Sequence, residues 1–257
     1  MNRVWRRRLA VALAVALAAA GGLVVAHYLD SHPSPTERVF DRPEQATGPV
    51  ELDLVWRAGA PSDGEKLFAL TFDDGPDPQW TPQVLDILAA HGAHATFFML
   101  GEAAQANPDL VAQVVAGGHQ IGLHGWDHSR LTTMSQDQIG DALDRAAAAI
   151  AAAGGGQPGL LRPTYGRIDA PGLGAVAERG YRVVLWSHAL HGDEAAAGEV
   201  DQIVAGASPG MIVLCHDGRT EPTAELMVRI DELLSQLEAD GYRAVTVGEL
   251  LAAATPD

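Results

Sequence analysis

The sequence predicts an α/β fold in which about seven parallel β/α units form a closed or nearly closed barrel. Three observations predict it. From residue 66 onward, short apolar runs alternate with longer segments of helical periodicity. Glycine and proline stand at the joints between them. Of the 257 residues, 47% are hydrophobic and 19% charged, which suits one globular domain with a short appendage.

The expected strands and helices follow one another in order. Residues 67–72 are a short apolar run that favours a strand, and residues 81–91 have the periodicity of a helix. The other expected strands are residues 95–100, 120–124, 160–162, 181–187, 211–216 and 243–247, and expected helices include residues 136–153 and 225–239. Because the carboxyl ends of parallel strands meet at one edge, polar residues after these strands are candidates for a ligand site.

The first 65 residues precede this pattern. Residues 1–8 contain four arginines, and residues 9–26 are an uninterrupted run of Ala, Val, Leu and Gly, the arrangement of an export signal. Eighteen apolar residues are at the lower limit for crossing a bilayer of ~30 Å, so a cleaved signal peptide and a retained anchor are both open. We expect an exported protein, secreted or tethered to the outer face of the cytoplasmic membrane.

The sequence therefore divides into three predicted parts. Residues 1–29 are a signal peptide or membrane anchor. Residues 30–65 are a proline-containing linker and lead-in, with a short strand-like patch at residues 52–56. Residues 66–257 are the main domain.

The chain is acidic, with a formal net charge of −16. Since such a body repels phosphate backbones, nucleic acid is not an expected partner. The single cysteine, Cys215, cannot form an internal disulfide, so the compartment is read from the N-terminal segment instead. The sequence carries no signal for an oligomeric state.

The first predicted strand ends in two adjacent carboxylates, Asp73 and Asp74, followed by a Gly-Pro turn. Adjacent residues on an extended chain point in different directions. One carboxylate can therefore bind a cation while its neighbour faces a substrate. The alternative interpretation is a solvated acidic turn.

The third predicted strand ends in His124, and His128 follows four positions later. The two imidazoles can converge on one ion if the segment curls helically. With Asp74 they form a set of two histidines and one carboxylate, which leaves coordination positions open. This spacing alone is weak, because paired histidines are often part of a polar turn.

Together with two further strand ends, these residues resemble the motifs of the polysaccharide deacetylase family. This family is also called the NodB-homology family and carbohydrate esterase family 4, and the resemblance runs from about residue 66 to residue 251. The first, second, third and fifth motifs of the family correspond to Thr71 to Pro76, to His124 with His128, to Arg162-Pro163 with Tyr165, and to Leu214 with His216. The resemblance implies a distorted (β/α) barrel.

The resemblance also implies an activity, which is hydrolysis of the acetamide of N-acetylated sugars with release of acetate. It implies that Asp74, His124 and His128 hold one divalent metal, usually zinc or cobalt, with zinc the first choice. Asp73 would be the general base and Arg162 its ion-pair partner, which keeps the carboxylate ionised.

The remaining roles concern the two ends of the acetamide. His216 would protonate the departing amine, and the backbone N–H of Tyr165 would meet the oxyanion on a loop stiffened by Pro163. Leu214 and Trp186 would line the pocket for the acetyl methyl group. By composition alone, Leu214 and Trp186 are simply core residues.

The fourth motif departs from the family pattern. Ala189 and Gly192 stand where aspartates that tune the catalytic histidine are expected, although Asp193 or Glu194 could substitute after a shift. Without a carboxylate partner, His216 is expected to titrate near ~6.5. Gly125 also replaces the Ser or Thr that commonly follows the first histidine, which removes a hydroxyl that could brace the loop.

Two alternatives to the deacetylase remain. The altered fourth motif also fits a catalytically weak carbohydrate-binding protein on the same fold. A set of two histidines and one carboxylate can serve iron and oxygen chemistry, although Asp73 would then be redundant. The expected substrate is an N-acetylated glycan, and peptidoglycan, chitin-like oligomers and secreted polysaccharides all remain open.

Overall fold

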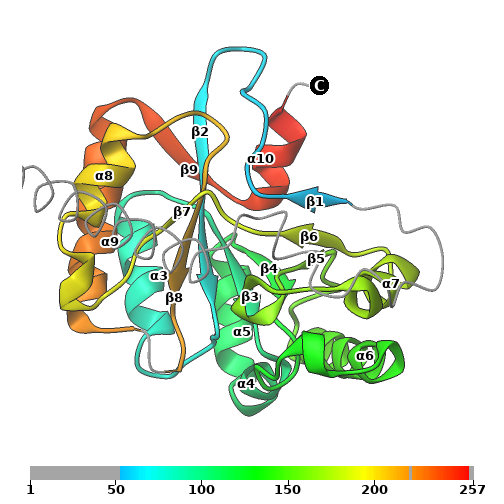
Figure 1. The fold of residues 1–257 in the computed structure, drawn as a ribbon. Coiled ribbons are helices and arrows are strands. Elements are labelled where there is room, and N and C mark those ends of the chain that lie inside the picture. Colours follow the sequence, from blue (N-terminus) through cyan, green and yellow to red (C-terminus); the bar gives the residue numbers. More distant parts are fainter. Residues whose placement is uncertain (1–52, 220–221, 255–257) are drawn as a thin grey trace, which may run out of the picture.

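The computed structural model describes residues 53–219 and 222–254 (Figure 1). Their centre is a nine-stranded sheet in which all the paired strands run parallel. The strands are β1 (Leu54–Val55), β2 (Lys66–Asp73), β3 (Ala95–Met99), β4 (Gln120–Leu123), β5 (Leu160–Leu161), β6 (Arg182–Val184), β7 (His188–Ala189), β8 (Ile212–His216) and β9 (Tyr242–Val245). Their order is β1-β6-β5-β4-β3-β2-β8-β7, and β9 pairs with the first half of β2.

The sheet curls because β6 and β7 are two parts of one nearly continuous segment. On the β6 side, the Leu185 N–H donates to the Val55 carbonyl at 2.7 Å. Two residues later, the Ser187 N–H donates to the Ile212 carbonyl at 2.9 Å, and β7 then pairs with β8. The chain thus passes from one end of the sheet to the other. This confirms the predicted distorted (β/α) barrel.

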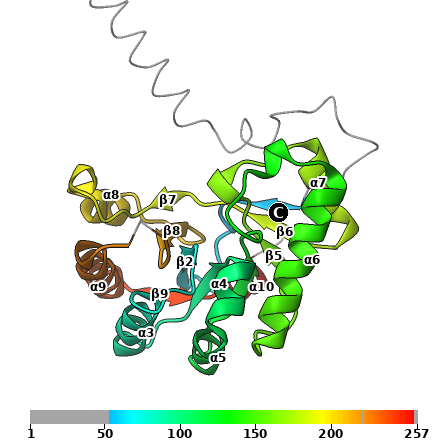
Figure 2. The same cartoon turned by 90° about the horizontal axis from the view of Figure 1, so that it is seen from below.

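Helices surround the sheet, as the view from below shows (Figure 2). They are α3 (Thr81–Ala90), α4 (Gly101–Ala106), α5 (Pro108–Ala116), α6 (Gln136–Ala152), α7 (Ala170–Glu178), α8 (Glu199–Ala205), α9 (Ala224–Ala239) and α10 (Val247–Ala253). Local sequence explains where they begin. Ser135 and Gln138 form a capping box before α6, and Thr223 caps α9 through the Leu226 N–H.

The strand β2 lies at the centre of the core. Seven of its eight residues are buried, as expected for a parallel strand covered on both faces. Phe72 stacks on Phe97 of β3 with ring centroids 5.0 Å apart. All seven strands expected from the sequence are present, but the stretch expected at residues 181–187 is regular only over β6 and then bends toward β8. This rigid centre fixes the ends of β2, β4, β5 and β8 relative to one another.

The strand β1 comes from the strand-like patch in the predicted lead-in and pairs with β6. The sheet therefore includes residues before Lys66, while the domain boundaries themselves stay a prediction. The expected signal peptide or anchor lies outside the described residues. Within the described ranges, no helix is both long and apolar enough to span a bilayer.

His91 ties the end of α3 to α9. Its Nε2 lies 3.0 Å from Asp231 Oδ1, and its Nδ1 lies 3.1 Å from Glu238 Oε1. Burial alone would lower the pKa of His91, but hydrogen bonds to the two carboxylates raise it above its usual value of 6.5. Since the folded pKa exceeds the unfolded one, the stabilisation is complete below about pH 6.5 and is lost as the pH rises through the folded pKa.

We therefore expect His91→Gln to lower the melting temperature by about 2 °C near neutral or lower pH, because these pairs are partly exposed. The deficit should shrink in alkaline buffer, where wild-type His91 is neutral as well. Thermal unfolding of both proteins at about pH 6 and about pH 9 measures this. A deficit of the same size at both values would contradict the assignment.

Candidate active site

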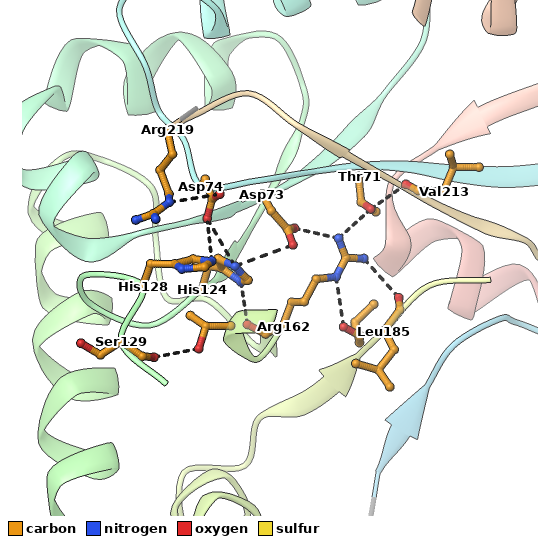
Figure 3. Close-up of polar contacts among 12 residues, drawn as sticks. Thr71, Asp73, Asp74, His124, His128, Ser129, Arg162, Leu185, Val213 and Arg219 are labelled. Atoms are coloured by element: carbon orange, nitrogen blue, oxygen red, sulfur yellow. Dashed lines mark hydrogen bonds and ion pairs between the residues drawn. The ribbon is translucent and has the colours of Figure 1, made fainter. Parts of the chain in front are cut away.

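The carboxyl ends of β2, β4, β5 and β8 bring polar side chains from four distant parts of the sequence together (Figure 3). Asp73 is the last residue of β2, His124 follows β4, Arg162 follows β5, and His216 ends β8. Asp73 and His216 are register partners in neighbouring strands. The topology of the sheet therefore assembles the site from residues that are far apart along the chain.

Asp74, His124 and His128 form a cluster with the spacing of metal ligands. Asp74 Oδ1 lies 3.3 Å from His128 Nε2 and 3.5 Å from His124 Nε2, and one ligand atom from each residue lies within 4.8 Å of the others. Two ligands bound tetrahedrally at ~2.1 Å from one ion would be ~3.4 Å apart. Two imidazoles and one carboxylate are a donor set suited to zinc. These residues therefore fit a single divalent metal.

The surroundings prepare both imidazoles for ligation. His124 Nδ1 donates to the Arg162 carbonyl at 2.8 Å, since a carbonyl can only accept, and this leaves the lone pair on Nε2. Burial lowers the pKa of His124 to about 3 and that of His128 to about 4. Both rings are therefore neutral at neutral pH, the state in which histidine binds a metal.

Asp73 lies beside this cluster and makes an ion pair with Arg162. The Arg162 Nη1 to Asp73 Oδ1 distance is 2.7 Å, and Asp73 Oδ2 lies 3.7 Å from His124 Nε2. Burial raises the pKa of Asp73, against the opposing effect of Arg162. A buried carboxylate with a raised pKa is a candidate general base.

Arg162 is fully buried, so each of its polar contacts matters. Besides Asp73, its guanidinium donates to Thr71 Oγ1 at 2.8 Å and to the carbonyls of Val184 and Leu185 at 3.2 Å each. The guanidinium carbon also lies 5.5 Å from the centroid of the Trp186 ring. Trp186 thus lies close to the ion pair, and its predicted role in an acetyl pocket stays a prediction.

Strained backbone concentrates at this site. Among the described residues, four other than glycine have positive φ: Asp74 (76°), His128 (63°), Tyr165 (60°) and Arg219 (61°). Asp74 and His128 are candidate ligands. Arg219 Nε lies 3.6 Å from Asp74 Oδ2, and the Tyr165 ring centroid lies 4.4 Å from that of His128. Such conformations cost free energy and cluster where a structure fixes functional groups.

The loop after β5 carries the predicted oxyanion residue. Pro163 precedes a 3₁₀ turn, Thr164–Gly166, in which Tyr165 is 46% exposed and lies beside His128. The Thr164 hydroxyl donates to the Ser129 carbonyl at 2.8 Å. This bond ties the turn to the histidine loop. Gly125 has a φ of 84°, a conformation in which Ser or Thr would be strained. The hydroxyl that braces the loop belongs to Thr164.

The pKa of His216 differs from the value expected from the sequence. We expected a pKa near 6.5, but burial lowers it to about 4, although Asp73 opposes this. Neither ring nitrogen of His216 makes a hydrogen bond within the described part of the chain. Leu214, two residues earlier on β8, is 5% exposed and is the register partner of Thr71. His216 and Leu214 therefore lie beside the Asp73–Arg162 pair.

Among the described residues of the fourth-motif segment, neither Asp193 nor Glu194 makes a hydrogen bond or ion pair with His216. Ala189 lies in β7 opposite Leu214, and a Cβ added to Gly192 would overlap Thr223 Oγ1. Asp193 is used elsewhere, because its side chain accepts a hydrogen bond from the Ala196 N–H at 3.1 Å. The suggested substitution by Asp193 is therefore not what the structure has.

Three residues at the site were given no role from the sequence: Thr71, which begins the first motif, Asp217 and Arg219. The signal for a role of Thr71 was its position two residues before Asp73, on the same face of the strand. Asp217 is fully buried, accepts a hydrogen bond from Thr81 at 2.6 Å, and has a pKa raised by burial to about 7. Asp217 and Arg219 lie one and three residues after His216, so their place after a strand end was the available signal.

Comparison with known proteins finds one family and consistent relatives. The model of the family described as polysaccharide deacetylase matches residues 60–184. A peptidoglycan-N-acetylglucosamine deacetylase of Bacillus cereus is 42% identical over 192 residues, which cover 73% of this chain and 89% of that protein. The peptidoglycan-N-acetylmuramic acid deacetylase PdaC of Bacillus subtilis is 34% identical over 72% of this chain, but the match covers only 39% of that longer protein.

A solved structure supports the same grouping. A family 4 carbohydrate esterase from Streptomyces lividans, in complex with acetate, superposes with a TM-score of 0.67 and 31% sequence identity. The match covers 75% of this chain and 98% of that one. The family model itself spans β2 to β6 and so includes Asp73, Asp74, His124, His128 and Arg162.

Proposed function

This chain belongs to the polysaccharide deacetylase family, and on that premise we propose that it removes acetyl groups from N-acetylated sugars of a cell-wall glycan, releasing acetate. The observation that carries the proposal is the juxtaposition of two carboxylates with different partners. Asp74 lies with two imidazoles and Asp73 with a guanidinium. Asp74, His124 and His128 would hold one divalent metal, with zinc the first choice and cobalt an alternative.

The proposed reaction begins with water. When bound, the metal would polarise the acetamide carbonyl and acidify a water molecule. Asp73 accepts the proton of the attacking water as the water oxygen forms its bond to the carbonyl carbon. Arg162 supports this role by holding Asp73 Oδ1 at 2.7 Å, which leaves Oδ2 toward the cluster. The chain therefore keeps its base oriented while the substrate enters.

The reaction ends with departure of the sugar amine. The backbone N–H of Tyr165 stabilises the negative oxygen, and Pro163 restricts the loop that presents it. His216, the register partner of Asp73, donates the proton that the leaving nitrogen must gain. Leu214 and Trp186 receive the acetyl methyl group. Arg162 acts in the reaction through Asp73 and does not itself contact the substrate.

The direct test is acetate release by the purified, zinc-loaded protein from N-acetylglucosamine oligomers, from peptidoglycan fragments and from an N-acetylated polysaccharide. We expect release from at least one, with peptidoglycan favoured by the relatives' substrates. The second candidate, a carbohydrate-binding protein with little activity, is motivated by Ala189 and Gly192. Sugar binding without acetate release would favour that candidate and contradict the proposed hydrolysis.

We also propose that the chain acts outside the cytoplasm. The arginine-led apolar segment at residues 1–26 supports this, and so does the extracellular position of the glycans on which the relatives act. Fractionation of cells producing the full chain tests it. Activity recovered in the wall, membrane or medium is expected, and activity confined to the cytosol would contradict it.

A further inference from the structure

The fourth-motif segment places a second histidine beside His216. Ala189 of β7 pairs with Leu214 of β8, and the Leu190 N–H donates to the Leu214 carbonyl at 2.8 Å. Two residues beyond this pair come His191 and His216. Parallel strands in register therefore bring both imidazoles to the same edge of the sheet.

The burial pattern indicates which way His191 points. Leu190 is fully buried, whereas Ala189 and His191 on either side of it are partly exposed. Alternate residues of an extended chain face opposite sides, so His191 shares its face with Ala189 and with the Leu214–His216 side of β8. The two imidazoles are close enough that a charge on His191 lowers the pKa of His216.

Glu199, at the start of α8, fixes the orientation of His191. Its carboxylate accepts the His191 backbone N–H at 2.8 Å and lies 3.0 Å from His191 Nδ1. Because a carboxylate accepts, Nδ1 carries the hydrogen and Nε2 is the nitrogen directed away from Glu199. This is the arrangement in which a carboxylate orients an imidazole for proton transfer and stabilises the imidazolium.

The backbone around His191 is held from α9. Arg229 Nη1 donates to the carbonyls of His191 and Asp193 at 2.7 and 2.9 Å, and the Thr223 hydroxyl donates to the Gly192 carbonyl at 3.1 Å. The His191 side chain nevertheless remains 41% exposed. It is therefore positioned rigidly and stays open to substrate and water.

We infer that His191, oriented by Glu199, is a second general acid beside His216 and donates a proton to the departing sugar amine. The inference rests on the proposed deacetylation. Glu199 of α8 would thus replace the carboxylates that the fourth motif lacks. It would act by orienting His191 rather than His216. Since His216 makes no hydrogen bond to a carboxylate among the described residues, His191 supplies an imidazole whose orientation a carboxylate fixes.

The proton balance is complete with groups already present. Water adds to the carbonyl carbon and gives one proton to Asp73. When the C–N bond breaks, its electron pair stays on nitrogen, which takes one proton, from His191 Nε2 whenever His216 is neutral. The neutral imidazole is recharged from solvent, and Asp73 returns its proton to solvent. The charged and titratable groups around the pair are Glu199 on α8, Arg229 on α9, Asp193, and, near His216, Asp73, His124 and Arg162.

The test compares two leaving groups. A sugar acetamide needs a proton on nitrogen, whereas 4-nitrophenyl acetate releases a phenolate that needs none. We expect His191→Gln and His191→Ala to lower kcat/KM for the acetamide by about 100-fold, with an effect of less than about 3-fold on the ester. Glu199→Gln should act in the same direction to a smaller extent. The loss should fall on kcat rather than on KM.

The matched control is His188→Gln, a histidine of the same segment whose Nδ1 lies 3.0 Å from the Ser187 hydroxyl oxygen. It should keep both activities. Acetamide hydrolysis within about twofold of wild type in His191→Gln would overturn the inference, as would equal losses on amide and ester, which indicate a structural role. A wild-type protein that cleaves neither compound would instead overturn the proposed function.

Discussion

Replacing Asp73 by Asn is expected to lower kcat/KM for acetate release by about 1,000-fold, within the range typical of a general base. Asn keeps the shape of the side chain but cannot accept the proton of the attacking water. The other carboxylate, Asp74, cannot take over because it belongs to the imidazole cluster. The measurement is steady-state acetate release by the zinc-loaded variant.

The variant has one side effect that must be separated from catalysis. Arg162 is fully buried and would lose the charge that it pairs with, which typically costs about 3–5 kcal/mol. Zinc content and thermal unfolding are therefore measured alongside activity at a temperature where the variant is folded. The matched control is Asp86→Asn on the exposed side of α3. It should leave activity, zinc content and thermal unfolding unchanged. A folded, zinc-loaded Asp73→Asn protein with near-normal activity would refute the assignment.

Loss of the metal is expected to abolish activity to a similar degree and to lower stability as well. A ligand present at 100 times its dissociation constant stabilises the folded state by about 2.7 kcal/mol, or about 5–10 °C in melting temperature for a domain of this size. We therefore expect zinc to raise the melting temperature of the chelator-treated wild type. Thermal unfolding with and without added zinc measures this.

The His124→Gln and His128→Gln variants separate this site from adventitious binding. Each should lose acetate release and most of the zinc-dependent rise in melting temperature. His94→Gln should keep both, because His94 is exposed and precedes β3, at the opposite end of that strand from the carboxyl edge of the sheet. An equal zinc response in all four proteins would place the metal elsewhere.

Much of the fold could be predicted because its signals are local. The apolar runs that became β2, β3 and β8 are short, continuous and bounded by turn residues, as buried parallel strands are. The cluster of Asp74 with His124 and His128 could be predicted because strand ends in such folds share one edge. The metal itself and the catalytic roles stay predictions.

What was missed depends on contacts between distant parts of the chain. The pKa of His216 was expected near its usual value because burial at a strand end cannot be read from neighbouring residues. The carboxylate of Glu199 was overlooked because it follows His191 by eight positions and returns only through the fold of α8. The bend after β6, which closes the barrel, likewise depends on pairing with β8.

The most direct measurement is a crystal structure of the zinc-loaded protein with anomalous scattering data at the zinc edge. We predict a single peak at about 2.0–2.2 Å from a carboxylate oxygen of Asp74, from His124 Nε2 and from His128 Nε2. Asp73 should remain paired with Arg162. A peak at another place, or these three side chains turned too far apart to share one ion, would contradict the account.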